Sequence, residues 1–95
     1  GGVAPVTIAK RKRGTIMSYK EGRLGYNGKN KRYGLLISDL WEKDGFHCGN
    51  HMEVCLNGEW IPTQIEMDSK EQWYLTGTDK AGTELEGLKV RIETE

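Results

Sequence analysis

Histidine and cysteine side chains are concentrated in one short segment, at His47, Cys48, His51 and Cys55. Both residue types bind zinc, and a thiol beside a histidine can act as a nucleophile. The spacing disfavours a structural zinc site, because such sites usually join two separate elements of the chain. His51 and Cys55 are expected on one strand about 13 Å apart, too far to share one ion. No metal or cofactor is therefore predicted, and a metal or thiol site at His47, Cys48 and His51 is kept as an alternative.

The rest of the sequence contains no recognisable catalytic constellation. Its 13 glycines are scattered through expected turns, and none forms a phosphate-binding loop before a helix. A reactive thiol needs a neighbouring base and a third group that orients this base, and no such triad can be read. The sequence therefore predicts a protein that is not an enzyme and has no catalytic residues.

Composition and turn spacing indicate one small all-β domain. The chain has 95 residues, 13 glycines and two prolines, and short alternations of apolar and polar residues recur between expected turns. Short strands without a long helix favour a closed barrel, because closure removes exposed sheet edges. The prediction is a small SH3-like barrel of five to six antiparallel strands over residues 23–95, after a flexible basic tail over residues 1–22.

The strongest hairpin signal is Asn57-Gly58, between residues 51–56 and 59–67. A two-residue loop fixes the pairing, so that Cys55 faces Trp60. One face of the hairpin then carries the predicted core residues Met52, Val54, Leu56, Ile61, Ile65 and Met67. The opposite face carries His51, Glu53, Cys55, Trp60, Pro62, Gln64 and Glu66. Proline has no N–H, so the strand should be an edge or irregular at Pro62.

The remaining elements are expected on both sides of this hairpin. Asn27-Gly28 predicts an earlier hairpin, followed by a strand over residues 32–38. Residues 39–50 allow two alternatives, either a helical turn capped by Ser38 or an extension of the preceding strand to Trp41. Further strands are expected at residues 72–76 and 88–94.

Charge is distributed asymmetrically along the chain. Residues 1–33 contain nine Lys or Arg and one acidic residue, whereas residues 34–95 contain five Lys or Arg and thirteen acidic residues. A basic arm of this kind can contact a polyanion, and it can also stay solvated or pair with the acidic body. The candidate nucleic-acid contacts are Lys10, Arg11, Lys12, Arg13, Arg23, Lys31 and Arg32.

Trp60 is predicted on the outer face of its hairpin, where a large aromatic side chain needs an explanation. One interpretation is an aromatic platform for a peptide or an unstacked base, made with Tyr74 and Trp41. The alternative is that the tail or the 39–50 loop covers Trp60. The acidic body favours a protein partner, and the predicted partner-binding residues are Trp60, Tyr74, Trp41, Glu53 and Gln64.

Several short motifs follow one another in a specific order: Arg32-Tyr33, Phe46-His47-Cys48-Gly49, Glu53-Val54, residues 57–66, Trp73-Tyr74-Leu75 and residues 85–92. In this order they resemble a small bacterial family, a domain of unknown function found in conjugative and phage-like mobile elements. The resemblance implies an SH3-like barrel and a cytoplasmic bacterial protein, and it implies no activity. Gln64 stands where relatives usually have a basic residue, which weakens an anion-contact interpretation of that face.

The predicted function is a non-enzymatic binding module, a small adaptor or regulator that holds a protein or peptide. The alternative is a nucleic-acid-binding accessory protein that uses the basic arm and the first hairpin. No apolar run approaches the about 18 residues that cross a membrane, so no membrane contact is expected. Two cysteines are too few for a disulfide scaffold, and a cytoplasmic monomer with free thiols is expected.

Overall fold

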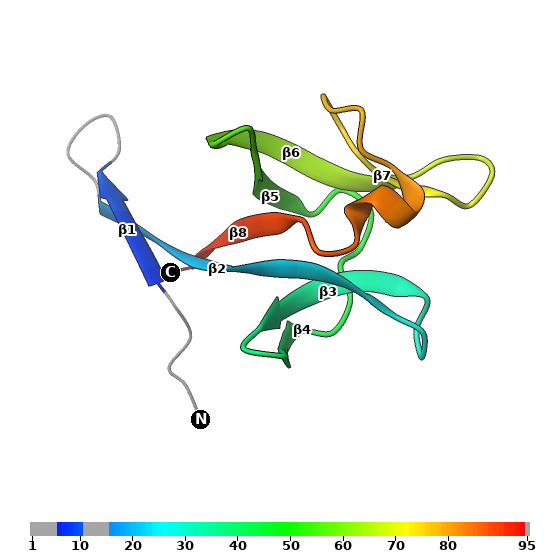
Figure 1. Cartoon of the computed structure of the whole chain (residues 1–95), viewed down its shortest axis with the longest axis horizontal. Helices are drawn as coiled ribbons and strands as arrows, with labels where there is room; N and C mark the ends of the chain where they lie inside the picture. The colour runs from blue at the N-terminus through cyan, green and yellow to red at the C-terminus, as the bar shows by residue number, and fades with distance from the viewer. Residues whose placement is uncertain (1–5, 11–15, 95) are drawn as a thin grey trace.

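The computed structural model describes residues 6–10 and 16–94, and this part of the chain is almost entirely β-structure (Figure 1). It forms eight strands and one short 3-10 helix, η1. The elements are β1 (Val6–Lys10), β2 (Ile16–Asn27), β3 (Arg32–Ile37), β4 (Leu40–Lys43), β5 (His51–Leu56), β6 (Glu59–Met67), β7 (Trp73–Leu75), η1 (Gly82–Leu85) and β8 (Lys89–Thr94). The described part contains no helix that is long and apolar enough to span a membrane.

Seven strands form one antiparallel sheet in the order β4-β3-β2-β8-β5-β6-β7, and β1 pairs with β2 outside this order. The long strand β2 connects the two halves of the sheet. Its residues 23–27 pair with β3, and its residues 18–23 pair with β8. The all-β prediction is therefore confirmed, with more strands than the expected five to six.

The expectation of a closed barrel is wrong. β4 and β7 lie at opposite ends of the strand order, and no ladder joins them within the described residues. These end strands contain only four and three residues. Side chains from outside the strands cover the core instead: Phe46 from the connection between β4 and β5 is 1% exposed, and Leu85 of η1 is 0% exposed. The apolar core is thus shielded without a closing pair of strands.

The predicted end of the tail, at residue 22, falls inside β2. Residues 16–22 belong to this strand, and its segment from Ser18 to Arg23 pairs with β8. Tyr19 is the only residue described as buried between 18 and 23, so the segment lacks the apolar alternation that predicts a strand. Residues 6–10 form β1, and the rest of the predicted tail lies outside the described residues.

The Asn57-Gly58 hairpin has the predicted register, with Cys55 opposite Trp60. Asn57 and Gly58 have φ angles of 53° and 81°, as a type I′ turn requires. The predicted core face is confirmed: Met52, Val54 and Ile65 are buried, and Leu56, Ile61 and Met67 pack against the core. The edge expected at Pro62 is also confirmed, because β7 pairs with β6 only at Ile65–Met67.

The first hairpin is present with a longer turn than a two-residue loop. Asn27 pairs with Arg32, and the residue with positive φ is Lys31, at 58°. After β3, Ser38 and Asp39 adopt φ angles of 52° and 63°. The chain therefore reverses at these two residues, and β4 returns along β3 as a separate strand. The prediction of a helical turn is therefore wrong. The strand alternative is correct in part, because residues 40–43 form a strand, but this strand does not extend β3.

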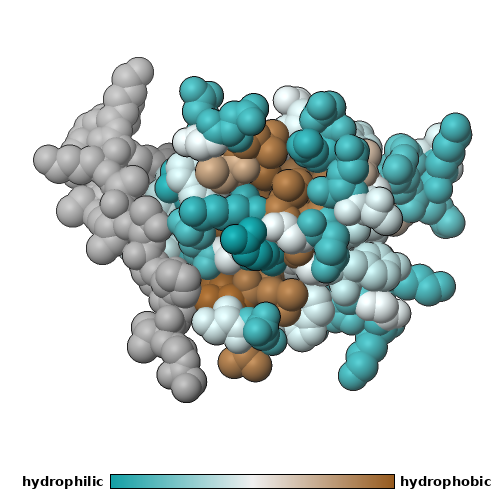
Figure 2. Space-filling model, viewed as in Figure 1, coloured by the Kyte–Doolittle hydropathy of each residue, from teal (hydrophilic) through white to brown (hydrophobic). Residues whose placement is uncertain are grey.

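Apolar side chains also reach the surface. Figure 2 shows brown areas between the hydrophilic side chains of one face, some of them over β3 and β4. Leu40 and Trp41 of β4 are 69% and 41% exposed. The Trp41 ring lies over two paired glycines, Gly25 and Gly34, because a Cβ atom at either position would approach ring atoms at 3.5 Å and 2.9 Å.

Candidate functional site

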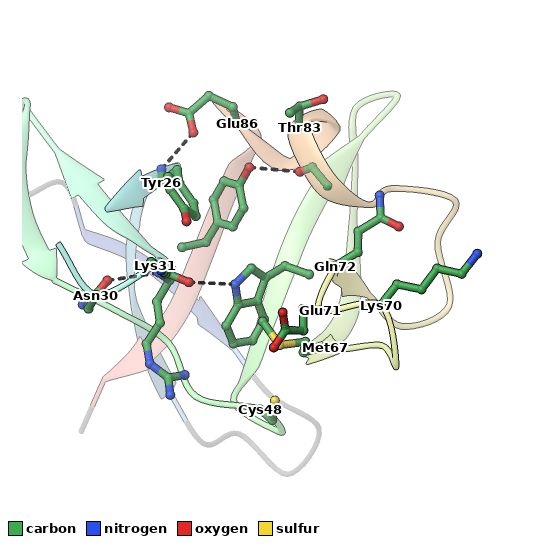
Figure 3. A pocket seen from close by; sticks show the side chains of 14 residues that line it. Tyr26, Asn30, Lys31, Cys48, Met67, Lys70, Glu71, Gln72, Thr83 and Glu86 are labelled. Atoms are coloured by element: carbon green, nitrogen blue, oxygen red, sulfur yellow. Dashed lines mark hydrogen bonds between the residues drawn. The ribbon is translucent and has the colours of Figure 1, made fainter. Parts of the chain in front are cut away.

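A cleft of about 1010 Å³ lies at the open side of the sheet (Figure 3). One wall is the β2–β3 hairpin, with Tyr26 and residues 30–33. The opposite wall consists of residues 70–73 at the β6–β7 turn and of η1 with its flanking residue Glu86. The cleft therefore lies between two parts of the sheet that no described ladder joins.

Two buried aromatic side chains form the floor of the cleft. Tyr33 and Trp73 are 5% and 6% exposed. The Tyr33 hydroxyl donates to the carbonyl of Gly82 at 3.0 Å, and the Trp73 indole N–H donates to the carbonyl of Lys31 at 3.0 Å. Each bond joins one wall to the other, so both rings are fixed in place before any ligand arrives.

Tyr26 stands at the rim of the cleft, next to the floor. Its side chain is 47% exposed, and its ring meets Tyr33 edge-on, with centroids 5.3 Å apart and an angle of 66°. The backbone N–H of Tyr26 donates to Oε2 of Glu86 at 2.8 Å. Burial raises the pKa of Tyr33, and the negative charge of Glu86 and the Tyr26 side chain raise it further. The Tyr33 phenol is therefore neutral at ordinary pH.

Charged groups of both signs line the walls. The Arg32 guanidinium lies 5.5 Å from the centroid of the Trp73 ring and donates to the carbonyl of Phe46 at 3.0 Å. Lys31 and Lys70 supply further cations, and Glu71 and Glu86 supply carboxylates. The cleft is thus aromatic at its floor and mixed in charge at its rim.

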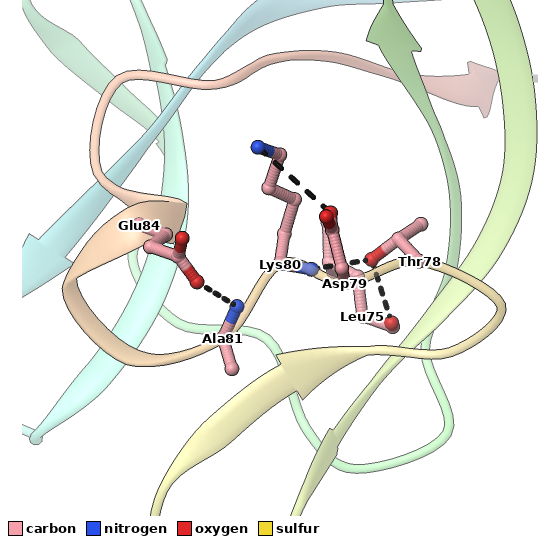
Figure 4. Close-up of polar contacts among 6 residues, drawn as sticks. All are labelled: Leu75, Thr78, Asp79, Lys80, Ala81 and Glu84. Atoms are coloured by element: carbon pink, nitrogen blue, oxygen red, sulfur yellow. Dashed lines mark hydrogen bonds and ion pairs between the residues drawn. The ribbon is translucent and has the colours of Figure 1, made fainter.

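The position of η1 is set by polar contacts in the loop before it (Figure 4). The Thr78 hydroxyl donates to the carbonyl of Leu75 at 2.9 Å and accepts from the N–H of Lys80 at 3.0 Å. The N–H of Ala81 donates to Glu84 at 3.4 Å. Buried Leu85 anchors the helix to the core. The sequence predicted no helix between the strands expected at residues 72–76 and 88–94.

Trp60 lies on the outer face of the sheet, as predicted, where it contacts an arginine. The centre of the Arg91 guanidinium lies 4.2 Å from the Trp60 centroid and 4.1 Å from the Tyr19 centroid. Arg91 also donates to Glu53 at 2.6 Å. Tyr19 lies on β2, next to β8, and Trp60 lies on β6, beyond β5, so that Arg91 contacts both rings. The cations described over the Trp60 ring, Lys89 and Arg91, come from β8, whereas the alternative named the tail or the 39–50 loop as the cover.

The predicted aromatic platform does not form. Tyr74 pairs with Glu66, six residues along β6 from Trp60, which corresponds to about 20 Å at the usual rise per residue. Trp41 lies on β4, at the other end of the sheet. Gln64, a further predicted contact, lies 3.4 Å from the His51 ring and 3.4 Å from the carbonyl of Gly49.

The predicted nucleic-acid contacts are divided among different places. Lys31 and Arg32 line the cleft, whereas Arg23 donates to the carbonyl of Gly87 at 2.9 Å and lines another hollow. Residues 11–13 lie outside the described residues, and for Lys10 only the backbone, in β1, is described. The described cations therefore do not form one continuous basic surface.

The proposed metal cluster is not assembled in the described part of the chain. No group of three or more His, Cys, Asp or Glu side chains there is placed to hold an ion. The backbone N–H of His47 donates to Oδ1 of Asn50 at 2.8 Å. The exposed Cys48 lines the aromatic cleft. Both Cys48 and Cys55 are free thiols.

Sequence reasoning missed Tyr26, Tyr33 and Trp73 as one site. It expected strands over residues 32–38 and 72–76, which contain Tyr33 and Trp73, and it assigned no role to Tyr26. Tyr33 and Gly82 are 49 positions apart, and Lys31 and Trp73 are 42 positions apart. No local pattern brings such positions together, so only the topology reveals the cleft.

The fold and the cleft define a small all-β domain with an open antiparallel sheet. Residues 22–92 match the domain of unknown function DUF5348, and the chain belongs to this family. A crystal structure of a protein from Ruminococcus gnavus is similar, with 34% sequence identity and a TM-score of 0.65. The similarity covers 77% of this chain and 100% of the Ruminococcus chain. No curated protein matches the chain.

Proposed function

We propose that the protein is a non-enzymatic binding module whose cleft holds an extended segment of a partner protein. The observation that carries this proposal is the half-exposed ring of Tyr26 beside the aromatic floor of a cleft of about 1010 Å³. Grooves lined by aromatic side chains are a recurrent means of binding extended peptides. As a small bacterial adaptor or regulator, the protein would need no catalytic group.

The cleft is well prepared for a peptide. Tyr33 and Trp73 are held by hydrogen bonds across the cleft, so binding does not have to order these rings. The exposed residues Gln72 and Thr83 line the same wall, where their side chains can bond to a peptide backbone. Aromatic floor and polar rim together match the usual composition of small binding sites.

The charges favour a peptide over a nucleic acid. A nucleic acid is bound mainly through phosphates, and phosphates require a surface of predominantly positive charge. In the cleft, Glu71 and Glu86 lie among the same lining residues as Lys31, Arg32 and Lys70. A polyanion that stacked on the aromatic floor would therefore meet carboxylates as well as cations.

Selection from a displayed peptide library on the wild-type protein tests the proposal. Selected peptides should bind Tyr26→Ala at least about tenfold more weakly, because a half-exposed aromatic anchor is removed. The matched control is Tyr74→Ala, a partly buried tyrosine outside the cleft. Equal binding to both variants, or a loss only in Tyr74→Ala, would overturn the proposal.

The nucleic-acid alternative is tested with single-stranded DNA at low salt. Binding of DNA without any selectable peptide also contradicts the peptide proposal. Phosphate contacts would then give a log–log salt slope of about −0.7 per contact.

A further inference from the structure

We infer that the corner of the cleft formed by Tyr26, Tyr33 and Glu86 receives a Lys or Arg side chain of the bound segment. This inference rests on the proposed function and names the chemistry of one position in the partner. It requires an aromatic surface that attracts cations, a carboxylate without a cationic partner, and access from solvent. The structure provides each of these.

The aromatic surface comes from two tyrosines that meet edge to face. Their centroids are 5.3 Å apart, and this arrangement leaves Tyr26 47% exposed beside the buried Tyr33 ring. A cation over the face of an aromatic ring is attracted by the ring quadrupole. Figure 3 shows Tyr26 and Glu86 together at one end of the cleft, away from Lys70.

The carboxylate of Glu86 is fixed but not neutralised. Its Oε2 accepts the N–H of Tyr26 at 2.8 Å, which holds the group beside the two rings. The described ion pairs join other residues, and none involves Glu86. Arg23 lines the neighbouring hollow with Glu86, yet its guanidinium donates to the carbonyl of Gly87. A cation from a ligand would therefore find this carboxylate available.

The negative charge of Glu86 acts on the aromatic part of this corner. The charge of Glu86 contributes to the raised pKa of Tyr33, so its field reaches the Tyr33 phenol. Lys31 also lines the cleft, but it forms no described ion pair with Glu86. A partner cation is the complement of this corner.

Two small probes test the inference without knowledge of the partner. Nα-acetylated arginine amide carries the guanidinium as its only charge, and Nα-acetylated citrulline amide is its neutral analogue of similar shape; both probes are used in this acetylated form. We expect arginine amide, but not citrulline amide, to shift the amide NMR signals of residues 26, 33 and 86–87. Equal shifts with both probes, or shifts elsewhere only, would contradict the inference.

Charge-neutral variants identify the group responsible. Glu86→Gln keeps an oxygen for the Tyr26 N–H and removes the charge, so arginine amide should bind about fivefold more weakly. Glu59→Gln, which neutralises an exposed carboxylate outside the cleft, is the matched control and should bind like wild type. Tyr26→Leu, which removes the aromatic ring, should bind more weakly than Tyr26→Phe, which keeps it. Unfolding curves establish that each variant is folded.

The outcome also separates this inference from the proposed function. In one outcome, selected peptides depend on Tyr26, contain no Lys or Arg, and bind Glu86→Gln as strongly as wild type. This result would support the peptide-binding function and contradict the inference of a site for a cationic side chain. Peptides whose binding needs both a basic residue and Glu86 would support both. If no peptide depends on Tyr26, the proposed function is lost and this inference with it.

Discussion

The indole N–H of Trp73 donates a hydrogen bond to the backbone carbonyl of Lys31 at 3.0 Å. β7 lies at one end of the strand order, and Lys31 directly precedes β3, which lies second from the other end. A side chain thus connects two parts of the sheet that no backbone ladder connects. This bond and the Tyr33–Gly82 bond hold the cleft at its present width.

Removal of this bond is expected to destabilise the protein. Trp73→Phe keeps an aromatic ring but leaves the Lys31 carbonyl without the indole donor and creates a small cavity. We expect a loss of about 1–3 kcal/mol in the free energy of unfolding. Urea denaturation measures this loss. Trp41→Phe is the control, because Trp41 is 41% exposed, and a result of equal size for both variants would contradict the interpretation.

Arg91 is expected to stabilise the outer face through its planar guanidinium. The group stacks near Tyr19 and Trp60 and bonds to Glu53, and the side chains of Arg91 and Glu53 are 12% and 25% exposed. Arg91→Lys keeps the charge but loses the planar stacking, which should cost about 1–2 kcal/mol in thermal or urea unfolding. Arg23→Lys, at an exposed arginine with one described bond, should change stability by less than about 0.5 kcal/mol. Similar losses in both variants would show that the aromatic stack contributes nothing.

Gly34 is expected to tolerate no side chain. A Cβ atom there would meet the carbonyl oxygen of Lys43 and, at 2.9 Å, the ring of Trp41. Gly34→Ala should therefore destabilise the protein by about 1–3 kcal/mol through forced shifts of β4. Gly28→Ala is the matched control, because a Cβ atom at Gly28 meets nothing within 4 Å. Equal stability of the two variants in chemical denaturation would show that β4 moves away freely.

Tyr33 is expected to make stability fall at alkaline pH. Its folded-state pKa is raised above the ordinary value of 10.0, so the unfolded chain loses this proton first. The contribution of the neutral Tyr33 phenol to the free energy of unfolding is complete below about pH 10, and it is lost as the pH rises through the folded-state pKa. Tyr33→Phe lacks this contribution, and its stability should fall less between about pH 9 and about pH 11 than that of wild type. The free energy of unfolding is measured against pH for both proteins, and parallel curves would contradict the prediction.

Local chemistry explains what could be predicted from the sequence. Asn57 and Gly58 favour a type I′ turn, in which both residues have positive φ. This turn then determines the register and both faces of the hairpin. Burial of Trp73 and Leu75, with Tyr74 less buried between them, follows from simple alternation. These features depend on neighbouring residues, which a sequence displays directly.

The failures concern contacts between distant residues. Closure of the sheet depends on whether β4 and β7 are long enough to pair and on whether Phe46 and Leu85 cover the core instead, and no local pattern states this. Trp60 was predicted as a ligand platform because its partner Arg91 is 31 positions away and was not expected to stack on it. The cleft escaped prediction for the same reason.

The central place of β8 has a consequence for synthesis of the chain. β8 lies between β2 and β5, and Ser18 pairs with Thr94. The sheet is therefore incomplete until the ribosome has released the segment up to residue 94. Until then β2 and β5 present unpaired edges, which are the usual sites of misassociation between nascent chains. Rapid release, or a chaperone that shields these edges, should increase the yield of folded protein more than any change at the early strands.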